Sequence, residues 1–394
     1  MATPSSTSSS ELAQLCGGPP WALFGAIALL AVVEVGVRLA PPEIAIPHQS
    51  GGTEYHTARC YLDAFGPAEI SLFGTSRTRN GISVPELKAR LEAACQADAA
   101  IQRRFGDARI ANYACSGSNI EVAFSTLRYA LRLAPDRPRI AIFGVSAQQL
   151  MRGEELSNRA AVFWDIPDWV EAFDDTAAQA ADPRRSIWKL APIVVRNELG
   201  KNWLTLKYRL RPEAFVNDIV LAWKYRKTRS FTWDEILRGA PSPSPIRGEP
   251  APWHALEPER SLVTDPISDE RVQLYLQRIQ QAGETGLDPQ AVRLARRMVE
   301  LCRERNVPLI VFELPVSDRL ARYLPPGAND DLRRLFDELA DGENVVFVGL
   351  DQLGVSFSDA DFREQSHLNL RGATKLSDAL FERAILPELK RLSE

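Results

Sequence analysis

The sequence predicts an α/β protein, specifically a three-layer α/β/α sandwich with a parallel sheet. Short continuous apolar runs alternate with helical patterns from residue 67 onward, which is typical of a parallel sheet covered by helices on both faces. The alternation stops over 151–286, where the composition indicates a largely helical insertion. An uncharged apolar run near the N-terminus predicts a transmembrane helix in front of this domain.

The predicted strands are the apolar runs of the alternating region. In chain order they are Ile70 to Phe73, Ala108 to Ala114, Arg139 to Val145, Val307 to Leu314 and Asn344 to Leu350. Strands separated by helices pair in parallel, because the helical crossover carries the chain back to the end of the sheet at which the previous strand began.

The predicted helices begin at recognisable caps. Ser83-Val84-Pro85-Glu86 is a capping box with proline in the first turn, and it opens a helix through Ala94. Asn119 is placed to cap a helix whose apolar residues share one face, namely Val122, Leu127, Ala130 and Leu131. Further helices are expected over 288–304 and 329–340.

The N-terminal region divides into three predicted segments. Residues 1–16 are rich in serine and threonine and predict a disordered tail. Residues 17–40 contain the uncharged run Trp21 to Val33, and about 20 apolar residues suffice to span a bilayer. We expect a retained single-pass anchor, with a cleaved signal peptide as the alternative. The absence of a basic segment before the run favours the anchor, and 41–66 is a connector to the 67–394 domain.

The bulk composition is that of an ordinary globular protein of 394 residues, with 45% hydrophobic and 25% charged residues. A net charge of −4 argues against nucleic-acid binding, because there is no overall basic field to attract phosphates. The five cysteines show no metal-binding spacing and there are only four histidines. We therefore expect no metal site and no cofactor.

The insertion contains a basic, aromatic stretch from Lys201 to Arg229, with eight Lys or Arg residues against two acids. Its interleaved tryptophans and tyrosines are compatible with contact to anionic lipid headgroups. The alternative is a solvated helix face whose aromatic side chains pack inward. A proline-serine loop follows at 241–245.

A serine and a distant histidine are the candidate catalytic residues. Ser76 follows the first predicted strand through Gly74-Thr75, and His367 lies in Glu364-Gln365-Ser366-His367-Leu368-Asn369 near the C-terminus. A serine hydroxyl becomes a strong nucleophile only when a neighbouring base takes its proton, and histidine exchanges protons near neutral pH. The alternative for Ser76 is a plain strand-to-helix turn.

These motifs resemble the SGNH/GDSL hydrolase superfamily, most closely its membrane-anchored branch, over 67–150 and 305–394. The resemblance implies that Ser76 is the nucleophile and His367 the general base. Glu364 stands where the family usually has aspartate, so it is the expected acid, with Asp361, or else Asp359, as the alternative. The oxyanion hole is expected from the backbone N–H groups of Ser76 and Gly117.

One departure from that family pattern bears on the oxyanion hole, and two arginines beside the nucleophile bear on substrate binding. Ser146 occupies the position where the family has an oxyanion-binding asparagine, so a hydroxyl is expected to replace the amide. Arg77 and Arg79 flank the nucleophile and are candidates to hold an anionic glycan or acyl carrier, with solvent-facing charge as the alternative. Asn119 is a further candidate for substrate binding.

The resemblance implies a membrane-tethered serine esterase or acyltransferase outside the cytoplasm, acting on a cell-envelope glycan or related acyl ester with a membrane-bound acyltransferase as partner. One alternative is a non-catalytic scaffold or glycan-binding protein of the same fold, which the missing amide favours. A third is a cytoplasmic lipase-like hydrolase, because Arg38 favours a cytoplasmic C-terminal side.

Overall fold

The computed structural model describes residues 21–39, 66–115, 117–151, 160–165, 286–322, 324–364 and 366–394, together with Tyr55, Ala58, Arg59, Leu62, Asp168 and Trp169. Five strands form one parallel sheet in the order β2-β1-β3-β4-β5. They are β1 (Ile70–Phe73), β2 (Ile110–Asn112), β3 (Ile140–Val145), β4 (Leu309–Glu313) and β5 (Val345–Val348). The predicted α/β class with a parallel sheet is therefore confirmed.

Four of the five strands are shorter than the apolar runs that predicted them. β1 has the predicted bounds, whereas β2 spans only three residues at the edge of the sheet. The Asn112 side chain accepts a hydrogen bond from the backbone N–H of Ala114 at 3.1 Å. The bond pairs the Ala114 N–H, while the N–H groups of Tyr113 and Cys115 on either side donate to the carbonyls of Leu72 and Gly74.

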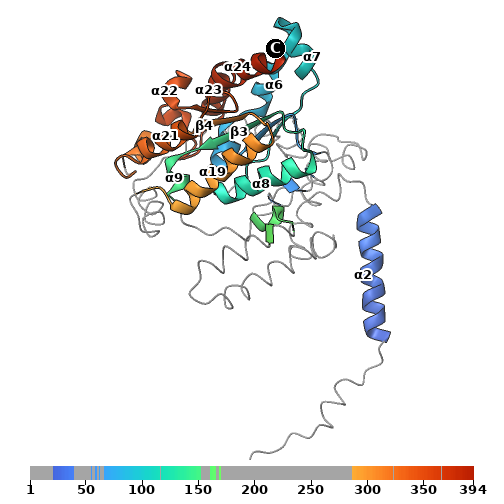
Figure 1. The fold of residues 1–394 in the computed structure, drawn as a ribbon. Helices are drawn as coiled ribbons and strands as arrows, with labels where there is room; N and C mark the ends of the chain where they lie inside the picture. The colour runs from blue at the N-terminus through green and yellow to red at the C-terminus, as the bar shows by residue number, and fades with distance from the viewer. Residues whose placement is uncertain are drawn as a thin grey trace, which may run out of the picture.

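Helices cover both faces of the sheet (Figure 1). One face carries α8 (Ile120–Leu133), α19 (Pro289–Glu304) and α21 (Ala328–Leu339), and α8 and α19 lie side by side. The other face carries α6 (Val84–Ala97), α7 (Ala99–Phe105), α23 (Leu370–Leu380), the π-helical turn η4 (Phe381–Ile385) and α24 (Leu386–Ser393). Short helical segments complete the domain: α5 (Ser76–Gly81), α9 (Ala147–Leu150), η1 (Ala161–Phe163), α20 (Asp318–Ala321), α22 (Leu350–Leu353) and η3 (Asp359–Asp361).

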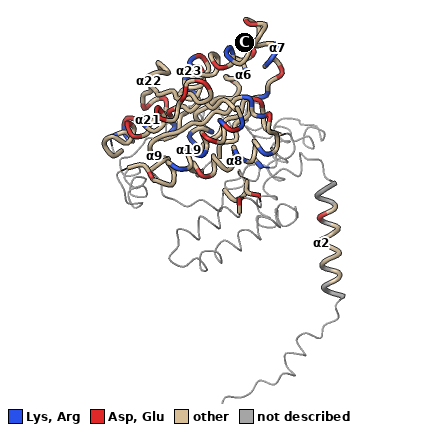
Figure 2. The backbone as a smooth tube through the Cα atoms, viewed as in Figure 1, with Lys and Arg blue, Asp and Glu red and all other residues tan. Residues whose placement is uncertain are grey.

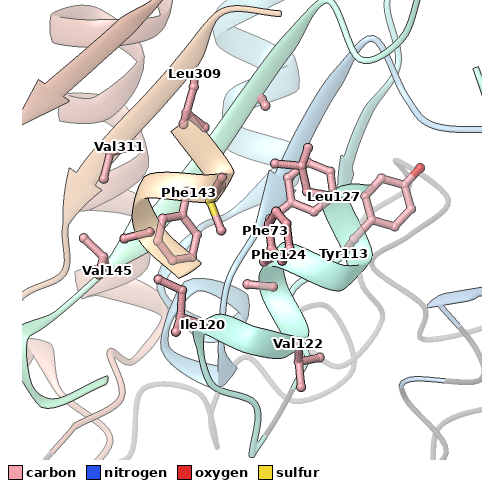
Figure 3. Close-up of a cluster of buried hydrophobic side chains, with 14 of the residues drawn as sticks. Phe73, Tyr113, Ile120, Val122, Phe124, Leu127, Phe143, Val145, Leu309 and Val311 are labelled. Atoms are coloured by element: carbon pink, nitrogen blue, oxygen red, sulfur yellow. The ribbon is translucent and has the colours of Figure 1, made fainter. Parts of the chain in front are cut away.

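Side chains alternate between two hydrophobic cores, one on each face of the sheet. Phe73 and Phe143 belong to the core that α8 covers (Figure 3), whereas Leu72 and Ile142 belong to the opposite core. Burying one such side chain contributes about 1.5–3 kcal/mol. Because both cores are apolar, the central strands read as continuous apolar runs in the sequence.

The predicted caps form. The Ser83 hydroxyl accepts from the backbone N–H of Glu86 at 3.4 Å, and the Asn119 side chain accepts from Val122 N–H at 3.3 Å. These bonds satisfy backbone donors that the first turn of a helix leaves unpaired. Helix α6 continues to Ala97, beyond the predicted end.

Parts of the predicted connector and insertion pack against the domain. Tyr55, Ala58 and Leu62 are buried in the core that α8 covers. From the insertion, the Trp164 indole donates to the Ser125 hydroxyl at 3.0 Å, and Asp168 pairs with two arginines of α8. The tail 1–16, the basic stretch Lys201 to Arg229 and the loop 241–245 lie outside the described residues.

Helix α2 (Trp21–Leu39) falls within the predicted anchor segment. It exposes several large apolar side chains, namely Phe24, Ile27, Leu29, Leu30, Val32 and Val35. Most of the part of α2 coloured by residue type in Figure 2 is uncharged. Among the residues that the structure describes, no helix combines the length and apolar character required to cross a membrane.

Candidate active site

Ser76 lies at the first position of α5, directly after the carboxyl end of β1. Thr75 caps the helix by accepting from the backbone N–H of Arg77 at 3.3 Å. Gly74 has a φ of +147°, and a Cβ at this position would overlap the Thr78 hydroxyl group. The turn therefore requires glycine, and it places the serine at the edge where open α/β sheets carry their sites.

His367 is held by a short loop that precedes α23. The backbone N–H of Arg363 donates to the His367 carbonyl at 2.8 Å, and that of Asn369 donates to the Asp361 carbonyl at 2.9 Å. The Asn369 side chain then caps α23 by accepting from Gly372 N–H at 3.0 Å. Because both sides of the loop are hydrogen-bonded, the backbone of His367, which carries the imidazole, is held in place.

The structure brings Ser76, His367 and Glu364 together. His367 Nε2 lies 2.7 Å from Ser76 Oγ, within hydrogen-bond distance. On the other side of the ring, His367 Nδ1 is hydrogen-bonded to Glu364 Oε1. The Ser366 hydroxyl also donates to Glu364 Oε1 at 3.0 Å. The result is a connected Ser-His-Glu chain that a nucleophilic mechanism requires.

The pKa of the Glu364 carboxyl lies below its usual value although the group is largely buried. Burial by itself raises this pKa, but the hydrogen bond from His367, the charge of its ring and the bonds from Ser366 outweigh burial. Glu364 is therefore ionised at neutral pH. An ionised carboxylate at Nδ1 fixes the tautomer that leaves Nε2 ready to accept the serine proton.

Asp361 does not contact the imidazole, which makes it unsuited to the alternative role of acid. Its side chain is 0% exposed and accepts from Arg371 Nε at 2.8 Å and Lys375 Nζ at 3.0 Å. Burial raises its pKa, but the Ser358 N–H and the two cations lower it overall. The carboxylate anchors the histidine loop to α23.

We expect Asp361→Asn to destabilise the protein by about 2 kcal/mol at pH 7, because hydrogen bonds to a charged group are lost. A carboxyl whose pKa is lowered by folding stabilises above its unfolded pKa and loses that contribution as pH falls through its folded pKa. The difference between variant and wild type should thus shrink in acid. Denaturant unfolding at pH 7 and in acid measures this. Asp359→Asn, at an exposed carboxylate 3.7 Å from Arg319, is the control.

The loop after β2 lies beside the nucleophile turn. Thr75 and Cys115 form a parallel bridge, and the Ser118 hydroxyl donates to the Gly74 carbonyl at 3.1 Å. Gly117 lies in this loop with a φ of +65° and is exposed. Its backbone N–H and that of Ser76, the first residue of α5, are therefore carried by neighbouring segments at one edge of the sheet.

The three candidate substrate-binding residues are all buried. Arg77 is 5% exposed and Arg79 is 6% exposed, so neither is a solvent-facing charge. The guanidinium of Arg77 donates to protein oxygens of three other segments, which is not the arrangement expected of a group that receives an anionic substrate. The Asn119 side chain accepts the capping bond of α8.

Sequence reasoning missed two polar residues of this site, Ser366 and Gln149. Ser366 bonds Glu364, and Gln149 donates to the Thr75 hydroxyl while accepting from the backbone N–H of Ser146 at 3.0 Å. The position of Ser366 beside His367 was a usable signal. Nothing in the sequence marks Gln149. Within the described ranges, no group of three or more His, Cys, Asp or Glu residues could hold a metal ion.

A scan against protein-family models and a search of curated proteins both find no match for this chain.

We expect Glu364→Gln to lower kcat by about 10³- to 10⁴-fold, because an amide no longer stabilises the imidazolium and can orient the wrong tautomer. Asp361 cannot take over, since its carboxylate is bound to Arg371 and Lys375. Steady-state hydrolysis of a short acyl ester measures the loss. A variant with wild-type kcat would remove Glu364 from the mechanism.

Proposed function

We propose that the protein is a serine-dependent ester hydrolase or O-acyltransferase. The observation that carries the proposal is the connected chain from Ser76 through His367 to Glu364, at the carboxyl edge of a parallel sheet. Ser76 follows β1, and β1 lies beside β3 at the point in the sheet where the strand order reverses. Open α/β sheets bind ligands at this point.

The reaction begins when Ser76 Oγ attacks the carbonyl carbon of an acyl ester. His367 Nε2 takes the serine proton as the new bond forms, and Glu364 stabilises the resulting imidazolium. Backbone N–H groups of Ser76 and Gly117 stabilise the negative charge that develops on the carbonyl oxygen. His367 then returns the proton to the leaving alcohol, which leaves the acyl group on Ser76.

The second half-reaction transfers the acyl group to an acceptor hydroxyl. His367 removes the proton from water or from a sugar hydroxyl as that oxygen attacks the acyl carbon, and it then gives the proton to Ser76 Oγ as the bond between the acyl group and the serine breaks. The resemblance of the Ser76 and His367 motifs to SGNH/GDSL proteins supports an acylated cell-envelope glycan, or a related acyl ester, as the substrate class. It also supports a membrane-bound acyltransferase as the partner that supplies the acyl group.

The proposal is tested with a fluorophosphonate probe on the purified full chain. We expect covalent labelling at Ser76, mapped by peptide mass spectrometry, and slow release of acetate from an acetylated polysaccharide. A protein that folds but neither labels nor cleaves acyl esters would be a non-catalytic scaffold. Ser146, a hydroxyl at the position where the resembling family has an amide, is the observation that favours this second candidate.

Attachment to a membrane through α2, with the catalytic domain outside the cytoplasm, is part of the proposal. The exposed apolar side chains of α2 support contact with lipid. Asp107→Cys introduces a thiol at an exposed position, and the described cysteines Cys95, Cys115 and Cys302 are buried. In a parent that also carries Cys16→Ser and Cys60→Ser, which removes the two cysteines outside the described residues, an impermeant maleimide should label the Asp107→Cys variant, but not the parent, on intact cells. Labelling only after lysis would contradict the orientation.

A further inference from the structure

Arg77 is a buried cation that connects four segments around the candidate site. Its Nε donates to the Ser366 carbonyl at 3.0 Å, and its Nη2 donates to the Pro315 carbonyl at 2.9 Å. Its Nη1 donates to the Ser146 hydroxyl oxygen at 2.5 Å and to Gln148 Oε1 at 3.2 Å. The residue directly after the nucleophile therefore holds the histidine loop and the ends of β3 and β4 in place.

The contact with Ser146 decides what that hydroxyl can do. Ser146 Oγ accepts from Arg77 Nη1, so one of its two lone pairs is occupied by a charged donor. Among the residues that the structure describes, no acceptor takes the hydroxyl hydrogen of Ser146. A hydroxyl that accepts from a guanidinium becomes a stronger donor, because hydrogen bonds in a chain polarise one another.

The register of the sheet places this hydroxyl at the same edge as the nucleophile. Phe73 of β1 pairs with Phe143 of β3. Ser76 comes three residues after Phe73, and Ser146 comes three residues after Phe143. The two strands are direct neighbours in the sheet. Ser146 is therefore positioned to donate toward charge that develops on an acyl group bound at Ser76.

The same arginine supports the acid and base. Ser366, whose carbonyl accepts from Arg77 Nε, donates its hydroxyl to Glu364 Oε1. A shift of the Ser366 backbone would move both the carboxylate and the adjacent imidazole. Preorganised groups lose much of their catalytic effect when displaced by about 1 Å.

We propose that Arg77 is a positioning residue, which binds no substrate itself but orients Ser146 as a third oxyanion donor and holds the Ser366–His367 loop against the nucleophile. The proposal rests on the proposed acyl-transfer function. In this proposal Ser146, held by the Arg77 guanidinium, supplies the third hydrogen bond to the oxyanion, which a side-chain amide would otherwise supply.

The test is a double-mutant cycle with Ser146→Ala, Arg77→Met and the double variant, assayed on a short acyl ester. Active sites are titrated with the fluorophosphonate probe, so that loss of folded protein does not appear as loss of kcat. We expect Ser146→Ala to lower kcat by about 100-fold with KM nearly unchanged, as for loss of one oxyanion donor. Arg77→Met should lower kcat at least as much, and the double variant should be no worse than Arg77→Met alone.

Two further variants keep the test decisive. Arg103→Met makes the same substitution at an exposed arginine of α7 and should leave kcat unchanged. If Arg77→Met does not fold, Arg77→Lys replaces it in the cycle, since lysine retains the charge but cannot reach four acceptors at once. Ser146→Ala should then again have little added effect.

The outcomes separate this proposal from the proposed function. If wild type labels at Ser76 but Ser146→Ala retains kcat within about threefold, the oxyanion role fails while the enzyme stands. Independent effects of Arg77 and Ser146 that multiply would also overturn the proposal, because they would show that Arg77 does not act through Ser146. Failure of the wild-type protein to label would instead refute the enzyme itself.

Discussion

We expect Ser76→Ala to abolish covalent labelling by a fluorophosphonate and to lower acyl-ester turnover by roughly 10⁵- to 10⁶-fold, to the level left by the oxyanion donors and substrate binding. The reason is chemical: no other hydroxyl in the described residues accepts or donates a hydrogen bond at His367 Nε2. The measurement is probe labelling followed by gel fluorescence, together with steady-state kinetics on a short acyl ester.

The control is Ser356→Ala, which makes the same substitution at an exposed serine outside the triad. It should label and turn over as wild type does. Both variants should unfold at nearly the same denaturant concentration. Ser76 is only partly buried, and its hydrogen-bond partner His367 is partly exposed to water, so losing the hydroxyl strands no fully buried polar group. Full turnover by a folded Ser76→Ala protein would show that the Ser-His-Glu chain is not the catalytic centre.

The sheet and the histidine position were predictable because each has a local signal. The apolar runs identify the strands, since both faces of the central strands are covered by hydrophobic cores. The Ser83 and Asn119 caps fix two helix starts through side-chain bonds that span three residues. Ser76 and His367 stand out because one follows a strand and the other precedes a helix.

The burial of Arg77 was not predictable, because it depends on segments far away in the sequence. Its partners Ser146, Pro315 and Ser366 are brought to it only by the strand order and by the histidine loop. A guanidinium beside a serine is normally solvated, and propensity gives no reason to bury it. The same limit applies to Tyr55 and Leu62, which are in a segment predicted as a connector yet pack into the core.

His367→Ala is expected to lower turnover nearly as much as Ser76→Ala does. Without the imidazole the Ser76 hydroxyl keeps its proton, and it is a poor nucleophile in that state. The substitution removes the hydrogen bond to Glu364 as well, so that among the described residues the carboxylate keeps only Ser366 as a side-chain donor. Turnover and probe labelling should both fall, while circular dichroism should show an intact fold, because the loop backbone bonds do not involve the ring.

The double variant Ser76→Ala/His367→Ala distinguishes a concerted pair from two separate residues. Members of a triad act as a unit, so removing the second costs little once the first is gone. We therefore expect the double variant to match either single variant within about threefold. Added imidazole should restore part of the activity of His367→Ala but none of that of Ser76→Ala, because a free base can accept a proton but cannot replace the attacking oxygen. Losses that multiply, or rescue of both variants, would contradict the proposed proton transfer from Ser76 to His367.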